Sequence, residues 1–163
     1  MSMLLRSGWV QRHLSAQVDY TYDQTKLTSY NSYVGEAVSV PLPPVGGPMP
    51  GTPKNSAAVT LSYGNIMIAN GEMRYSVSAH YQSPVTPALS ATIPVVPGYT
   101  MVDTRLSYTY SHYEITAYCN NLTNNLGINS YSDPFNYSPQ NYQAIVSQPR
   151  TVGLTLVYSF KEH

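Results

Sequence analysis

Apolar and polar residues alternate along most of this chain, and this period of two constrains its fold more than any other feature. From Leu14 to Tyr22 the even positions are apolar or aromatic and the odd positions are polar. Five more segments repeat the pattern, at about residues 59–64, 74–82, 102–110, 113–120 and 151–160, and part of a seventh lies near Leu4–Val10. Alternate side chains of a β-strand point to opposite faces of the sheet, so each segment is predicted to be a strand with one apolar and one polar face.

The connections between these strands alternate between short and long. The long ones span about residues 27–56, 84–98 and 123–149. Among the short connections, the one between the second and third complete strands must contain an odd number of residues to keep both apolar faces on the same side of the sheet. This predicts a three-residue turn, Ala69-Asn70-Gly71, with Gly71 in the left-handed conformation. The next hairpin requires an even loop, and Ser111-His112 fits a two-residue turn. Strict alternation of this kind is typical of outer-membrane barrels, which have short periplasmic turns and long extracellular loops.

The composition agrees with strands that cross a bilayer. Only 10% of the residues are charged, against about 25% in an ordinary soluble domain. The 8 basic and 8 acidic residues balance, which argues against a nucleic-acid partner. The 16 tyrosines suit an aromatic girdle at a membrane interface. The start of the chain lacks the apolar stretch of an export signal, so we expect that signal to be missing from this sequence.

The charged residues of the strands fall on the polar face. These are Arg74, His80, Asp103, Arg105 and Glu114, which we predict to face the lumen. A charge on the lipid face would cost about 2–4 kcal/mol at mid-bilayer, and none of the apolar faces carries one. The predicted fold is all-β, with about six to seven antiparallel up-and-down transmembrane strands that form part of a large outer-membrane β-barrel.

Several motifs resemble the C-terminal barrel of TonB-dependent outer-membrane receptors. Gly51–Leu61 (GTPKNSAAVTL) looks like the family's entry from a loop into a strand, and Gly98–Tyr108 (GYTMVDTRLSY) resembles one of its strands. Cys119–Asn124 (CNNLTN) is similar to the segment that follows that strand, and Gln148–Phe160 resembles the closing strand. The motifs keep the family's order over about residues 14–160.

The resemblance implies that residues 1–163 are one partial barrel domain without the family's plug domain and energy-coupling box. We expect a C-terminal fragment, a truncated gene product or one with a miscalled start at Met1, because six or seven strands leave two open edges in hydrocarbon. Full-length relatives take up siderophore-iron, cobalamin or carbohydrate across the outer membrane. The implied partners are outer-membrane lipid, the barrel assembly machinery, the rest of the barrel with its plug, and TonB-type energy coupling through the absent N-terminal region.

Site residues are predicted in two places. In the last long loop, Tyr131, Asp133, Phe135, Tyr137 and Tyr142 are candidates for ligand contact, with loop packing and girdle aromatics as the competing interpretation. Phe160 is the predicted assembly signal, because a terminal aromatic helps the assembly machinery recognise such chains. Lys161–His163 follow it, whereas the aromatic is usually the last residue.

The sequence does not indicate an enzyme. The four histidines lack metal-ligand spacing, and neither a nucleophile elbow nor a phosphate-binding glycine loop occurs. No cofactor or metal is expected, and Cys119 is interpreted as a small apolar strand residue.

Two other interpretations remain open. One is a small self-contained, porin-like barrel, which would need an even number of strands and its own export signal. The other is a soluble Tyr-rich β-sandwich adhesin, which would tolerate charges on both faces of its strands.

Overall fold

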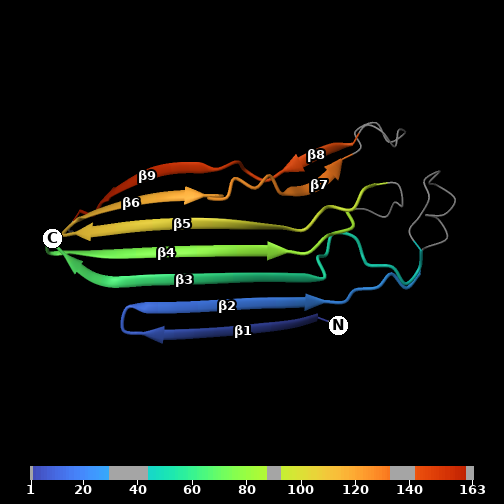
Figure 1. Ribbon diagram of the computed structural model, residues 1–163, viewed down its shortest axis with the longest axis horizontal. Coiled ribbons are helices and arrows are strands. Elements are labelled where there is room, and N and C mark those ends of the chain that lie inside the picture. Colours follow the sequence, from blue (N-terminus) through green and yellow to red (C-terminus); the bar gives the residue numbers. More distant parts are fainter. Residues whose placement is uncertain (1, 30–43, 88–92, 133–141, 161–163) are drawn as a thin grey trace.

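The chain forms one seven-stranded antiparallel sheet and a separate two-stranded hairpin (Figure 1). This computed structural model describes residues 2–29, 44–87, 93–132 and 142–160. The strands of the large sheet are β1 (Ser2–Gln11), β2 (Leu14–Asp23), β3 (Asn55–Ile68), β4 (Gly71–Gln82), β5 (Tyr99–Tyr110), β6 (Tyr113–Asn120) and β9 (Thr151–Tyr158). The hairpin consists of β7 (Ile128–Ser132) and β8 (Gln143–Val146). All the strands predicted from alternation are present, and the partial seventh is the complete strand β1.

The cross-strand register confirms the predicted faces. Val18 opposes Val59 and Tyr75 opposes Leu106 on the apolar face. On the polar face, Ser78 opposes Asp103. Large apolar side chains on the apolar face stay exposed, and the apolar residues that are buried in the described part of the chain are Val85 and Val96. A single sheet with an uncovered apolar face is not a β-sandwich, so the adhesin interpretation is wrong.

Tyrosines gather at both ends of the apolar face. Near the short turns these are Tyr63, Tyr75, Tyr108, Tyr110, Tyr113 and Tyr158, and near the long connections they are Tyr20, Tyr22 and Tyr81. Tyr75 and Tyr81 lie on one strand at a separation of roughly 20 Å, at about 3.3 Å per residue. Aliphatic residues occupy the band between them, which is the arrangement of an outward-facing barrel surface.

The sheet is open at both sides. β1 and β9 are its edges, and no pairing joins them within the described ranges. Neighbouring strands run in opposite directions, so the first and seventh strands run in the same direction. They therefore cannot pair with each other as neighbours of an up-and-down barrel, and the self-contained barrel is not what this chain forms.

Short turns and long connections lie at opposite ends of the sheet, as predicted (Figure 1). The turns Arg12-His13 and Ser111-His112 each join two strands with two residues. The long connection after β6 contains the hairpin β7–β8, which the sequence analysis did not anticipate. Within the described part of the chain, no helix is long and apolar enough to cross a membrane.

The predicted three-residue turn at Ala69-Asn70-Gly71 is wrong. Ile68 pairs with Gly71, so the turn has two residues, and Ala69 and Asn70 are the ones with positive φ (49° and 66°). The odd residue that the faces require lies instead in a β-bulge, where Gly64 and Asn65 together oppose Arg74. The bulge restores the parity, and Tyr63 opposes Tyr75 on the apolar face.

Candidate functional site: the polar face and the outer rim

The five charged residues predicted to share a face do so in the structure. Arg105 opposes Ser76, Asp103 opposes Ser78, and Glu114 opposes Thr109, all in one continuous polar register. Arg74 opposes Ser107 and His80 opposes Met101, so both lie on this face of β4. Their side chains are exposed or half-buried, so they are available to whatever lies against this face.

Ion pairs organise part of the polar face. Arg74 Nη2 lies 3.1 Å from Glu72 Oε1. His80 Nε2 lies 4.0 Å from Asp103 Oδ2, a contact that is an ion pair only when the imidazole is protonated. A third pair joins Arg6 Nε to Asp19 Oδ1 at 3.0 Å. Neither Arg6 nor Asp19 was among the charged residues predicted to face the lumen, although both lie in segments whose alternation was recognised. These pairs are open to solvent in this chain, so each adds little stability by itself.

A concave region of about 550 Å³ runs over the polar face of β4, β5, β6 and β9. Its lining includes Arg74, Arg105, Glu114, Tyr118 and Asn120 among serines and threonines. Ser107 and Thr116 share a hydrogen bond of 2.8 Å, and Thr116 Oγ1 donates to Glu114 Oε1 at 3.2 Å. The surface is lined mostly by polar side chains, and it is suited to hydrogen bonding with a protein surface or a polar solute.

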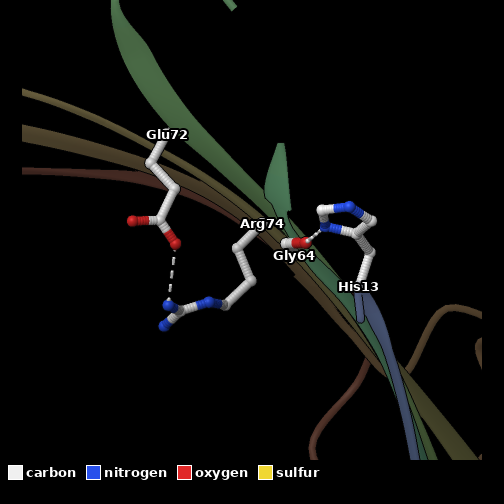
Figure 2. Close-up of polar contacts among 4 residues, drawn as sticks. All are labelled: His13, Gly64, Glu72 and Arg74. Atoms are coloured by element: carbon white, nitrogen blue, oxygen red, sulfur yellow. Dashed lines mark hydrogen bonds and ion pairs between the residues drawn. The ribbon is translucent and has the colours of Figure 1, made fainter. Parts of the chain in front are cut away.

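At the short-turn end of the polar face, the contacts centre on the β-bulge at Gly64 (Figure 2). Gly64 N donates to His13 O at 2.8 Å, and His13 Nδ1 donates to Gly64 O at 3.1 Å. A Cβ on Gly64 would lie 3.0 Å from Arg74 Cγ, so glycine lets the arginine side chain lie close over the bulge. The bulge thus links the first short turn to the Arg74–Glu72 ion pair.

At the end of the polar face near the long connections, polar groups cluster around Asn121. The side chain of Asn121 is buried and hydrogen-bonded to Asn125 and Gln148, and its backbone N–H donates to Asp103 Oδ1. Asn124 Oδ1 accepts from Arg150 N at 3.1 Å. Three of the motifs that carried the family resemblance therefore converge at one place. Their sequences were noticed as motifs, but the role of Asn121 was missed, because its partners lie up to 27 residues away.

The predicted ligand-contact residues are only partly described. Tyr131 is on β7 and Tyr142 directly precedes β8, and their rings lie 6.5 Å apart in an edge-on arrangement. Asp133, Phe135 and Tyr137 lie outside the described residues. The hairpin β7–β8 lies beyond the long-connection end of the large sheet (Figure 1). Within the hairpin, Tyr131 opposes Ala144, one pair before the last pair, Ser132 with Gln143.

Phe160 lies just beyond β9 and is 84% exposed. Its ring is 4.8 Å from that of Tyr158, which in turn lies 4.8 Å from the ring of Tyr113. The predicted assembly residue therefore belongs to an aromatic row at the short-turn end of the apolar face. Among the described residues, no group of three His, Cys, Asp or Glu side chains could hold a metal ion.

Comparison with known proteins bears on this architecture. The model of the family described as "TonB dependent receptor-like, beta-barrel" matches residues 4–122. The fold is similar to that of the ferric yersiniabactin uptake receptor FyuA from Yersinia pestis, with a TM-score of 0.75 and 16% sequence identity. That match covers 96% of this chain and 23% of FyuA, so the chain spans about a quarter of the length of that receptor. No curated protein matches the chain. With the family match covering most of its length, the chain belongs to the TonB-dependent receptor β-barrel family.

Proposed function

We propose that residues 1–163 are one partial barrel domain, the C-terminal wall of an outer-membrane TonB-dependent receptor that transports a scarce ligand. The observation that carries the proposal is the continuous register of two faces across all seven strands. It is joined by the match to a family of outer-membrane transport barrels. An apolar outer face and a polar inner face are what the wall of a membrane barrel needs. This role requires no catalytic site.

The proposed partners follow from the surfaces of the sheet. Outer-membrane lipid covers the apolar face, and further strands pair with the edges of β1 and β9, since open edges in hydrocarbon would leave peptide groups unsatisfied. A plug domain lies against the polar face that carries Arg74, Arg105 and Glu114. The barrel assembly machinery recognises the end of β9 through Phe160. TonB-type energy coupling drives the transport.

A ferric siderophore is the first ligand to test, because the similar structure is that of a ferric siderophore receptor. Cobalamin and carbohydrate are the other two classes. We propose that the outer hairpin contacts the ligand through Tyr131 and Tyr142, with Asp133, Phe135 and Tyr137 in the same loop. Aromatic rings suit all three classes, since they stack on planar groups and on sugar faces.

Uptake by the source cells tests the function. Cells with an intact or an interrupted coding region would be given radiolabelled ferric siderophores of several chelate types, cobalamin and oligosaccharides, with and without an uncoupler of the inner-membrane proton gradient. We expect one class to enter only when the coding region is intact and the gradient is present. Equal uptake of every ligand by both strains would contradict the proposal.

A membrane assay tests the location separately. Fractionated cells would be probed for the chain in outer membranes, with carbonate extraction to remove peripheral proteins. We expect the chain to stay in the outer membrane after extraction and to need detergent for release. Recovery in the detergent-free soluble fraction would contradict the barrel-wall role.

A further inference from the structure

We infer that Asn121 is a positioning residue for ligand binding: it holds the β7–β8 hairpin in one orientation relative to the barrel wall. The inference rests on the proposed function, since it assigns how the loop that meets the ligand is held. It concerns residues 121–132 and 142–150, which leave the end of β6, form the hairpin and return to β9.

The side chain of Asn121 joins the two ends of this connection. Its Nδ2 donates to the carbonyl oxygens of Asn125 and Gln148, each at 2.9 Å, and its Oδ1 accepts from the N–H of Asn125 at 2.9 Å. The residue is 1% exposed. Three main-chain groups therefore bond to one buried amide, and an unsatisfied buried group costs about 1–3 kcal/mol.

The backbone of Asn121 joins the same point to the sheet. Its N–H donates to Asp103 Oδ1 at 2.8 Å, and the next N–H, that of Leu122, donates to Val102 O at 2.6 Å. The φ angle of Asn121 is 51°, in the left-handed region that asparagine tolerates better than most residues. The chain therefore turns sharply off β6 and directs the amide under the base of the hairpin.

A second group of contacts continues from this base into the hairpin. Ser147 N donates to Gly127 O at 2.7 Å, and Ser147 Oγ donates to Asn125 O at 3.3 Å. Tyr99 Oη donates to Asn129 Oδ1 at 2.7 Å, and a Cβ on Gly127 would come within 2.6 Å of the Tyr99 ring. Tyr99 of β5 thus braces the first hairpin strand from the side.

Such anchoring matters because an isolated two-stranded hairpin is marginally stable in water. Tyr131 and Tyr142 lie beyond the anchored base, so their position depends on contacts made at Asn121 and Tyr99. A loop that is ordered before binding loses less conformational entropy when the ligand arrives, and its affinity is higher for that reason.

The test compares Asn121→Gly with Asn124→Gly in the full chain, in outer membranes. Glycine accepts the left-handed φ found at both positions, so each change removes only a side chain. We expect Asn121→Gly to speed amide hydrogen exchange in residues 128–132 and 143–146 by about tenfold or more, because the change removes the three hydrogen bonds of the Asn121 side chain. Exchange in β5 and β6 and the amount of chain in the membrane should stay as in the parent. Asn124→Gly, which loses one exposed bond, should change the hairpin by less than about threefold.

Ligand affinity is the second readout. Ferric yersiniabactin would be used first, and then whichever ligand the uptake assay identifies. We expect Asn121→Gly to weaken the Kd by about tenfold while the amount of assembled chain is unchanged. Unchanged exchange in the hairpin, or exchange that rises equally in β5 and β6, would overturn the inference. So would faster exchange in the hairpin with an unchanged Kd.

If the Asn121→Gly chain fails to assemble, the variant Tyr99→Phe tests the inference instead. It removes only the hydroxyl bonded to Asn129 and leaves the ring over Gly127. We expect faster exchange in residues 128–132 and a weaker Kd, and unchanged values of both would overturn the inference. If the parent chain binds and transports no ligand, the proposed function fails, while the exchange measurements still decide whether Asn121 anchors the hairpin.

Discussion

Tyr118 lies across Gly153 of the neighbouring strand, and a Cβ at position 153 would come within 2.4 Å of the ring. The two residues are direct partners in the pairing of β6 with β9. Tyr118 is the aromatic residue that interrupts the polar face of its segment, and the empty space over the glycine explains why it can lie there. The ring covers the glycine backbone, a device that compensates for a side chain missing from a strand.

Replacing Gly153 with alanine should therefore destabilise the sheet. The new methyl group would force the Tyr118 ring aside, at a cost of about 1–3 kcal/mol for an overpacked site. Gly8→Ala in β1 is the matched control, because its nearest neighbour would be Ala16 O at 3.7 Å. The temperature at which the folded band is lost from outer-membrane extracts on gels measures the change. A decrease in this temperature no larger than that caused by Gly8→Ala would contradict the contact between Tyr118 and Gly153.

The turn between β3 and β4 should be open to improvement. Both of its central residues, Ala69 and Asn70, have positive φ, which alanine adopts at a cost of about 1 kcal/mol. The double change Ala69→Asn with Asn70→Gly installs the residues that such turns prefer, and should stabilise the sheet by about 0.5–1 kcal/mol. Urea unfolding in detergent would show a higher midpoint. The same pair at Ser111-His112, where only Ser111 has positive φ, should gain less.

Neighbouring positions on β3 should differ strongly in how much a positive charge destabilises the sheet. Leu61 is on the apolar face and opposes Ala16 and Val77, whereas Thr60 is on the polar face and opposes Gln17 and Ser78. Leu61→Arg should cost about 2–4 kcal/mol if the apolar face meets lipid, and Thr60→Arg should cost little. The amount of each variant in washed outer membranes measures the difference. Similar amounts of both would show that lipid does not cover this face.

Phe160 should matter for assembly more than for the stability of the sheet. Its ring contacts Tyr158 and is otherwise exposed, so Phe160→Ala removes little buried area. We expect severalfold less chain in the outer membrane, with an unchanged unfolding midpoint for the part that is assembled. Ser159→Ala is the control and should leave both quantities unchanged. A lowered midpoint with normal accumulation would assign Phe160 a packing role instead.

The bulge at Gly64 marks the limit of what turn lengths can predict. The faces of β3 and β4 require one extra residue in their hairpin, and that requirement can be read from alternation alone. Where the residue goes depends on a competition between a three-residue turn and a two-residue turn plus a bulge. The bulge is favoured in this structure by the paired bonds between Gly64 and His13, which join residues 51 positions apart.

The sequence by itself determined the strands of the large sheet, their faces, the two-residue turn at Ser111-His112 and the sharing of one face by Arg74, Asp103 and Glu114. Those features follow from the alternation of polar and apolar residues, which has a period of two and involves only residues a few positions apart. Only the tertiary structure decided the bulge, the hairpin β7–β8, the cover of Tyr118 over Gly153 and the place of Asn121 beneath the hairpin. Each depends on contacts between groups far apart in the chain, which form only once the strands have paired. The alternation of polar and apolar residues carries no information about such contacts.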